Sequence, residues 1–141
     1  TPELCARWYT VGAFYPFSRN HNSWDTIAQE PWNFNTVYER SITYLDIIRN
    51  AMVTKLHLIR YYYTQLSKVQ TDGGAFYKPL FFEFPDEAGA YADQELNVML
   101  GSGVKLGVQS TGTGIDTTNF FFPAGLWCEI INRKGVDGCF T

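Results

Sequence analysis

The strongest candidate for chemistry in this sequence is His21, because of the residues that precede it. Residues 13–17 form a short aromatic run that Pro16 interrupts, and residues 18–22 follow abruptly as a polar cluster. A buried segment that ends in polar side chains is how a barrel strand delivers residues to a site. From spacing alone, a loop histidine bonded to the backbone remains an alternative interpretation of His21.

Carboxylates that could act as acids or bases occur along the chain, but the sequence does not show that any two of them lie together. Glu83 lies between Phe82 and Phe84, an apolar setting that disfavours an ionised carboxylate, although a strand residue facing solvent is the favoured interpretation. The candidates are Asp25, Glu30, Glu83, Asp86, Glu87, Asp93 and Glu95.

Nucleotide and metal sites are both disfavoured. The glycines around Gly101-Ser102-Gly103 precede a strand-like run, whereas a phosphate site needs a helix N-terminus. The two histidines and three cysteines have no zinc-type spacing, and we expect His57 to be packed or solvated within a helix. Cys128 and Cys139 could form a disulfide in an oxidising compartment or remain two reduced thiols. The sequence therefore predicts no metal and no cofactor.

The elements that must position His21 are helices on either side of it. Residues 2–12 predict a helix with Thr1 at the N-cap, and Leu4, Trp8 and Val11 share one apolar stripe. Residues 13–17 are expected to form a strand that ends in the polar cluster of residues 18–22, and residues 23–35 a loop. The capping-box pattern over residues 36–39 predicts a long helix to about residue 70 with a break near Asn50. Its stripe is Tyr38, Ile42, Leu45, Ile48, Met52, Leu56, Ile59, Tyr63 and Leu66.

The character of the chain changes after Gly74. Residues 76–84 are strand-like, residues 85–89 form a turn, and short β-type runs follow at 95–100, 103–109, 118–122 and 126–132. Glycine, serine, threonine and proline clusters separate these runs, a pattern typical of an all-β domain. We therefore expect an α/β part over residues 1–74 and an all-β part over residues 75–141.

Composition excludes two classes of protein. The 141 residues are 45% apolar, 17% aromatic and 18% charged, with a net charge of -3, so a phosphate-driven nucleic-acid binder is disfavoured. No apolar run is long enough for a membrane span. A helix start at Thr1, a strand-like end and an odd number of cysteines lead us to expect a piece of a larger fold.

The sequence contains the stretches "ELCARW", "GAFYPFSRNHNS", "QEP", "YYYTQL" and "KPLFFEFPDE". Together these stretches resemble glycoside hydrolase family 31, which includes α-glucosidases. The resemblance covers residues 3–87 well and residues 88–132 more loosely. It implies the last helix-strand-helix portion of a (β/α)8 TIM barrel over residues 1–74 and the beginning of a β-sandwich domain over residues 75–141.

The resemblance also implies residue roles. His21 matches a histidine that hydrogen-bonds the glucose held at the cleavage point, and Phe14, Arg19 and Asn20 match the same motif as structural positions. Cys5 matches a cysteine that pairs with one upstream of this chain. Departures from the family occur at Arg60, where relatives commonly have Pro, and at Lys55, where they have Arg. Arg60 is expected to let the helix run straight.

Retaining glycosidases need two carboxylates about 5 Å apart. The family motifs that carry them are missing here and would precede Thr1, so no catalytic residue is expected and the chain alone should be inactive. We therefore expect a segment of a retaining α-glucosidase that binds a maltose-like oligosaccharide and works with the remaining segments of the same enzyme. Alternatives are an inactive relative serving as a structural or carbohydrate-binding subunit, and a free-standing β-rich domain. The resemblance implies a lysosomal, vacuolar or secreted location.

Overall fold

The computed structural model describes residues 1–110, 118–130 and 138–141. Two compact units can be distinguished: the first holds residues 1–77, and the second holds the described residues from 78 onward. Within the described ranges, no helix combines the length and the apolar character that a membrane crossing requires.

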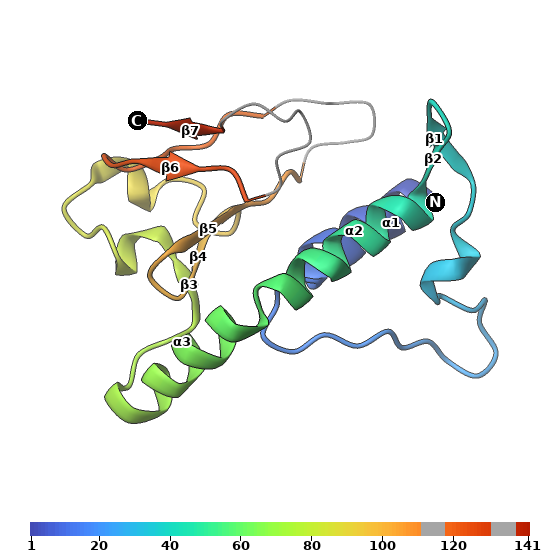
Figure 1. Ribbon diagram of the computed structural model, residues 1–141, viewed down its shortest axis with the longest axis horizontal. Coiled ribbons are helices and arrows are strands. Elements are labelled where there is room, and N and C mark those ends of the chain that lie inside the picture. The colour runs from blue at the N-terminus through green and yellow to red at the C-terminus, as the bar shows by residue number, and fades with distance from the viewer. Residues whose placement is uncertain (111–117, 131–137) are drawn as a thin grey trace. The chain divides into compact units, whose positions relative to one another are not determined.

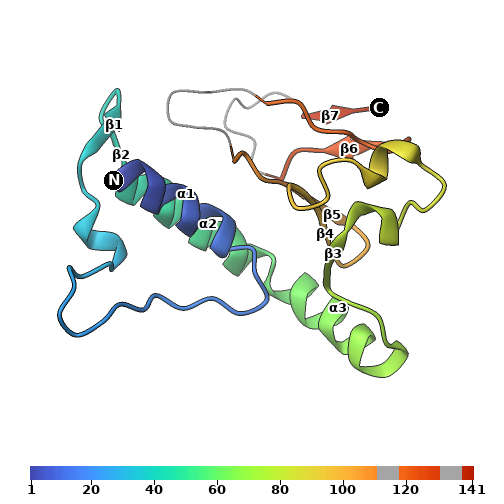
Figure 2. The same cartoon turned by 180° about the vertical axis from the view of Figure 1, so that it is seen from behind.

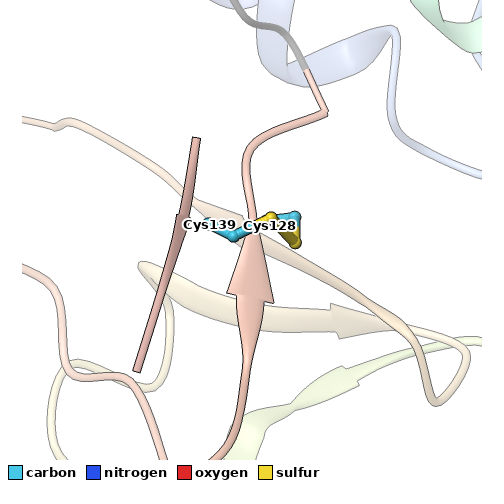
Figure 3. The surroundings of a disulfide bond; sticks show 2 residues. All are labelled: Cys128 and Cys139. Carbon is cyan, nitrogen blue, oxygen red and sulfur yellow. A yellow bond between two sulfur atoms is a disulfide. The ribbon is translucent and has the colours of Figure 1, made fainter. Parts of the chain in front are cut away.

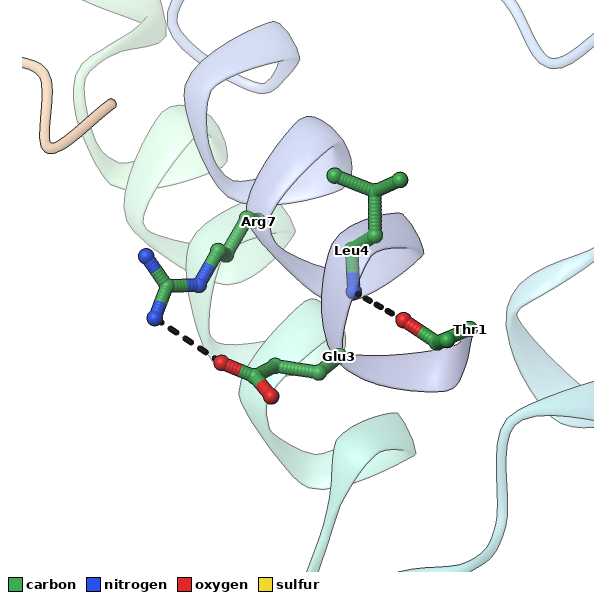
Figure 4. Close-up of polar contacts among 4 residues, drawn as sticks. All are labelled: Thr1, Glu3, Leu4 and Arg7. Carbon is green, nitrogen blue, oxygen red and sulfur yellow. Dashed lines mark hydrogen bonds and ion pairs between the residues drawn. The ribbon is translucent and has the colours of Figure 1, made fainter. Parts of the chain in front are cut away.

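The first helix, α1 (Pro2–Gly12), begins as the sequence predicts. The Thr1 hydroxyl accepts a hydrogen bond from the Leu4 amide at 3.3 Å, and Arg7 pairs with Glu3 one turn away at 2.8 Å (Figure 4). Its buried residue is Ala6, whereas Leu4 and Trp8 are mostly exposed. The predicted apolar stripe of α1 is therefore not the face that packs in this unit.

No strand forms over residues 13–17, so that prediction is wrong for this structure. Residues 13–17 are turns and bends, and residues 18–23 have no regular secondary structure. A parallel strand exists only beside hydrogen-bonded neighbours, and the described residues offer none here. The predicted loop over residues 23–35 is found, apart from one 3-10 turn, η1 (Pro31–Asn33).

The second helix starts later than predicted. Residues 36–39 lead into a hairpin of β1 (Val37–Glu39) and β2 (Ile42–Thr43), with Arg40 and Ser41 at positive φ in its turn. The capping box that is used lies further along: the Thr43 side chain accepts from the Asp46 amide, and Asp46 accepts from the Thr43 amide. The Thr43 hydroxyl also donates to the Asp46 carboxylate at 2.7 Å, and this bond, together with the bond from the Thr43 amide, lowers the pKa of the Asp46 carboxyl.

The long helical region is two helices, α2 (Tyr44–His57) and α3 (Ile59–Asp72). The break lies at Leu58, not near Asn50, and helical bonding resumes with the Tyr62 amide donating to the Leu58 carbonyl at 2.9 Å. Arg60 therefore stands in the first turn of α3 and does not keep the helix straight. A proline there would lose no helical hydrogen bond, because first-turn amides have no partner in the helix. Gly73 and Gly74, both at positive φ, end α3 as expected.

The first unit is held together by packing between α1 and α2. Figures 1 and 2 show α1 (blue) and α2 (green) side by side and running in the same direction. Ala6, Phe34 and Ile48 form a buried cluster between these helices and the end of η1. Most of the remaining predicted stripe along α2 and α3 is exposed, including Leu56 and Tyr63.

The second unit is built from short strands and 3-10 turns, and β3 (Tyr77–Pro79) lies at its boundary. The predicted strand over residues 76–84 is reduced to β3, which runs into η2 (Leu80–Phe82). The predicted turn at residues 85–89 overlaps the start of η3 (Ala88–Tyr91). A three-stranded sheet has the order β3-β4-β5, in which β4 (Asn97–Leu100) and β5 (Val104–Gly107) form an antiparallel hairpin. Both strands were predicted.

The core of this unit is a buried cluster of Leu80, Ala90 and Met99, against which aromatic side chains pack. Beside the sheet, β6 (Trp127–Cys128) pairs with β7 (Cys139–Phe140). No strand forms over residues 118–122. Residues 131 and 132 of the last predicted run lie outside the described residues.

Candidate functional site

The segment that carries His21 is attached to the helices by side chains of α2 and α3. The buried Tyr62 hydroxyl donates to the Phe14 carbonyl at 2.8 Å. The Lys55 ammonium donates to the Tyr15 carbonyl at 2.8 Å and to the Ser18 hydroxyl at 3.1 Å. These bonds satisfy backbone groups that have no strand partner. They hold the start of the segment in place.

Burial perturbs the ionisation of both anchoring side chains. It raises the pKa of Tyr62 to about 12, with smaller contributions from Tyr61 and Tyr77, and it lowers the pKa of Lys55. Tyr62 is therefore a neutral hydrogen-bond donor at any ordinary pH. Lys55 also lies over the Tyr62 ring, 5.9 Å from its centroid.

The end of the segment places His21 beside Arg19. One guanidinium nitrogen of Arg19, Nη2, lies 2.9 Å from Nδ1 of His21, and both side chains are exposed. The turn that follows is held by Asn22, whose amide donates to the Thr26 hydroxyl at 3.2 Å and to the Ser23 carbonyl at 3.1 Å. His21 therefore lies between two anchored points of the chain.

A cleft of about 630 Å³ lies between this segment and the helices of the first unit. Polar groups meet apolar faces in it, a combination that suits a small polar ligand with apolar surfaces. Its lining comprises Cys5, Trp8, Tyr9, Gly12, Ala13, Tyr15, Phe17, Ser18, Arg19, Asn20, His21, Gln29, Pro31 and Met52. The structure thus brings three residues of the predicted motif, His21, Arg19 and Asn20, to the same cleft, whereas Phe14 is buried and does not line it.

The wall of the cleft formed by α1 was not predicted. Trp8 is 63% exposed and lines the cleft, although its position in an apolar stripe predicted core packing. Tyr9 packs on the α1–α2 cluster, and its hydroxyl donates to the Gln29 carbonyl. Burial raises the pKa of Tyr9, with smaller contributions from Glu30 and Cys5. A helical stripe does not distinguish a core-facing residue from one that lines a cleft.

Cys5 has no disulfide partner among the described residues, and its sulfur lies 3.7 Å from the Gln29 side-chain oxygen. The pairing with an upstream cysteine that the resemblance implies is therefore still a prediction. Cys128 and Cys139, which sequence left open, are joined by a disulfide between β6 and β7 (Figure 3). This disulfide belongs to the second unit.

The candidate carboxylates do not gather at the cleft. Asp25 accepts from the Ser23 hydroxyl at 2.7 Å, and Glu30 accepts from the Asn33 amide at 3.1 Å. Glu83 is an ion-pair partner of Lys78 next to η2 and not a residue of a solvent-facing strand. Asp86, Asp93 and Glu95 are exposed, and Glu87 is half-buried.

The remaining sequence candidates have ordinary structural places. No group of three or more histidine, cysteine and acidic side chains that could hold a metal occurs in the described part of the chain. His57 is the exposed last residue of α2. Gly101-Ser102-Gly103 forms the turn between β4 and β5, with Gly101 at φ 60°, and does not open a helix.

Comparison with known proteins identifies the family that the sequence stretches resemble. Residues 1–65 match the Glycosyl hydrolases family 31 TIM-barrel domain. The chain is 39% identical over 139 residues to a protein named probable glucan 1,3-alpha-glucosidase of Arabidopsis thaliana, covering 97% of the chain and 14% of that protein.

Two relatives carry lysosomal names. The lysosomal acid alpha-glucosidase of Tetrahymena pyriformis is 45% identical over 96 residues, covering 67% of the chain and 10% of that protein. The lysosomal alpha-glucosidase of Rattus norvegicus is 33% identical over 131 residues, covering 92% of the chain and 13% of that protein. The chain thus spans 10–14% of the length of these three relatives.

Proposed function

This chain belongs to glycoside hydrolase family 31, and we propose that it is a segment of a retaining α-glucosidase that removes terminal α-linked glucose from oligosaccharides. The observation that carries the proposal is the cleft of the first unit. There His21, Arg19 and Asn20 meet the exposed ring of Trp8 and the ring of Tyr15. Sugars offer hydroxyls to polar groups and C–H faces to aromatic rings, so this lining suits one glucose unit.

His21 is the substrate-binding residue of this proposal. An imidazole can hydrogen-bond a sugar hydroxyl, and a bond that strengthens as the glycosidic bond breaks lowers the barrier to the reaction. Its attachment supports the role, because Lys55 and Asn22 hold the chain on either side of it. A ligand group in a cleft must be held in position to contribute to the transition state.

The proposal assigns residues 1–74 to the end of the catalytic barrel and residues 75–141 to the beginning of the proximal C-terminal β-sandwich domain. The family match over residues 1–65 and the separate compactness of the two units support this division. The exposed apolar stripe of α2 and α3 is also consistent with contacts to the remaining segments of the same enzyme.

Double displacement at an anomeric carbon requires a nucleophilic carboxylate and an acid/base carboxylate. In this proposal both come from outside the chain, so the segment alone has no activity. An inactive relative that only binds carbohydrate is the second candidate, because the cleft holds binding groups but none of the candidate carboxylates. Turnover by the complete protein separates the two.

We further propose a lysosomal, vacuolar or secreted location. Two relatives have lysosomal names, and a disulfide such as Cys128–Cys139 persists mainly in oxidising compartments.

The test is His21→Ala in the complete enzyme, measured as kcat/KM on maltose. We expect a loss of about 10- to 100-fold, which is the effect of removing one or two hydrogen bonds made in the transition state. His57→Ala is the matched control, since His57 is exposed at the end of α2 and should leave kcat/KM unchanged. Equal activity of the two variants would remove His21 from the site. Maltose binding without turnover by the unaltered protein would favour the carbohydrate-binding relative.

A further inference from the structure

The contact between Arg19 and His21 restricts which nitrogen of the imidazole carries the proton. Arg19 Nη2 lies 2.9 Å from His21 Nδ1, within hydrogen-bond distance. A guanidinium is protonated at every ordinary pH and has five N–H donors and no acceptor. In this contact Arg19 must donate, and Nδ1 must therefore accept through its lone pair.

A neutral imidazole carries one proton, so an accepting Nδ1 leaves that proton on Nε2. A doubly protonated ring would direct an N–H at the N–H of Arg19 and break the contact. The Nδ1–H tautomer fails for the same reason. Of the three protonation states of His21, only the neutral Nε2–H form is compatible with the observed pair.

We propose that Arg19 is a positioning residue that fixes His21 as its Nε2–H tautomer, so that His21 meets the sugar as a hydrogen-bond donor and the sugar hydroxyl accepts. The assignment of the tautomer follows from the Arg19 contact alone, whereas its meaning for the sugar rests on the proposed function. His21 can therefore only donate a hydrogen bond to the sugar through Nε2, whereas a histidine free to change tautomer could either donate or accept.

The local structure supports a dedicated pair. Arg19 and His21 are two residues apart in a stretch without regular secondary structure, so no helix or sheet geometry brings them together. Among the described residues, Arg19 is the hydrogen-bond partner of the His21 ring. Lys55 holds Ser18 just before the pair, and Asn22 holds the turn just after it. Both side chains line the same cleft.

The tautomer can be measured directly, without activity. Long-range 1H–15N correlation of the complete protein, labelled with 15N-histidine at neutral pH, gives one pattern for each histidine ring, and the patterns missing from His21→Ala and from His57→Ala identify these two rings. We expect an unprotonated Nδ1 and a protonated Nε2 for His21. His57 serves as the internal reference for an exposed ring. A protonated Nδ1 on His21 in the otherwise unaltered protein would overturn the proposal.

Arg19→Met removes the donor while keeping most of the side-chain length. In this variant the His21 pattern should shift toward that of His57, and Arg19→Lys, which is still an obligate donor, should restore part of the Nε2–H pattern. Arg60→Met is the matched control, because Arg60 is an exposed arginine on α3. An unchanged His21 pattern in Arg19→Met would contradict a positioning role for Arg19.

The consequence for the reaction is tested in the complete enzyme with a double-mutant cycle on maltose. Arg19→Met alone should lower kcat/KM about fivefold, and the same change in a His21→Ala background should lower it by less than about twofold, because Arg19 acts through His21. Equal losses in both backgrounds would show that Arg19 acts independently and would overturn the positioning role. If His21→Ala itself has no effect, the proposed function fails, while the tautomer is still decided by the nitrogen spectra.

Discussion

The β4–β5 hairpin and the segment of residues 15–30 satisfy their backbone groups in different ways. In the hairpin, four residue pairs from Asn97↔Gly107 to Leu100↔Val104 form an antiparallel ladder, and residues 97–100 are all buried. In the segment, residues 15–30 contain no helix and no strand. Side chains of α2 and α3 hold its beginning, and short-range side-chain bonds hold its turn.

The difference separates the region that packs a core from the region that carries the proposed binding residue. The hairpin is local in sequence, so its strands, its turn glycine and its buried face act together, and it contributes Met99 to the core of the second unit beside Leu80 and Ala90. The segment depends on residues far away in the sequence, and it carries the exposed His21. Binding residues commonly occupy loops held by a rigid scaffold, because a regular element would commit the same backbone and side chains to packing.

The largest effect is expected from Met99→Ala, which tests how much core packing stabilises the second unit. Met99 is fully buried against Leu80 and Ala90, so its truncation should lower the free energy of unfolding of the second unit by about 2–5 kcal/mol. The loss is measured by urea unfolding. The signal is the fluorescence of Trp127, in a protein in which the tryptophans of the first unit have been substituted. Leu126→Ala is the control, because Leu126 is 71% exposed. A loss below about 1 kcal/mol would show that the cluster does not carry the unit.

The next prediction concerns how much the disulfide stabilises the second unit. Replacing Cys128 and Cys139 together by serine should lower the free energy of unfolding by about 2–3 kcal/mol, because the bond closes a short loop that otherwise adds freedom to the unfolded chain. Amide hydrogen exchange should show the loss around β6 and β7 and leave residues 14–18 unchanged. Cys5→Ser, which removes a thiol without a disulfide partner in the described structure, is the matched control. A similar loss in this control would indicate a different cause.

A smaller effect is expected in the His21 segment from Tyr62→Phe. This change removes the bond to the Phe14 carbonyl and leaves that acceptor without its partner, at a cost of about 1–2 kcal/mol. Hydrogen exchange of residues 14–18 should become faster while β4 and β5 stay protected. Tyr63→Phe is the control, because Tyr63 is 79% exposed on the same helix. Unchanged hydrogen exchange at residues 14–18 in Tyr62→Phe would contradict the conclusion that the helices hold this segment in place.

The smallest effect is a pH dependence of the second unit. Burial lowers the pKa of Lys105 from 10.5 to about 8, so between these values the unfolded chain holds a proton that the folded chain has lost. Stability should therefore rise with pH in this window. The Phe122 ring, 4.1 Å from Nζ, favours the charged form and opposes the shift. Since Lys105 is only half-buried, screening by solvent limits the rise to about 1 kcal/mol.

The measurement is urea unfolding between pH 8 and 10. Above pH 10 the first unit should instead lose stability, because burial raises the pKa of its Tyr62 to about 12 and the unfolded chain loses that tyrosine proton first. Lys105→Met should flatten the rise, whereas Lys68→Met, at an exposed lysine of α3, should not. A rise that persists in Lys105→Met would assign it to other groups.

Local signals in the sequence predicted the elements that depend on neighbouring residues. Thr1 and Pro2 predicted the start of α1, Gly73 and Gly74 the end of α3, and the short apolar runs predicted β4 and β5. These signals succeed because caps, turn glycines and hairpins are formed by residues a few positions apart.

The wrong predictions share a different cause. Two capping-box patterns compete, at Thr36 and at Thr43, and only the second is used because the first lies in the β1–β2 hairpin. The strand over residues 13–17 failed because strand formation needs a partner strand. Nothing in the sequence marks Leu58 as the break between α2 and α3.

For the candidate site, the abrupt change from aromatic to polar residues singled out His21 as a candidate, and the resemblance to family 31 added Arg19 and Asn20 as structural positions. Only the tertiary structure decided the rest: that Trp8, Cys5 and Met52 complete the cleft, and that Lys55 and Tyr62 hold its rim. The pairing of Arg19 with His21, which decides the direction of hydrogen bonding, also needed three dimensions. Residue types determine what chemistry a chain can offer, but the contacts between distant segments decide which groups meet and which proton each one holds.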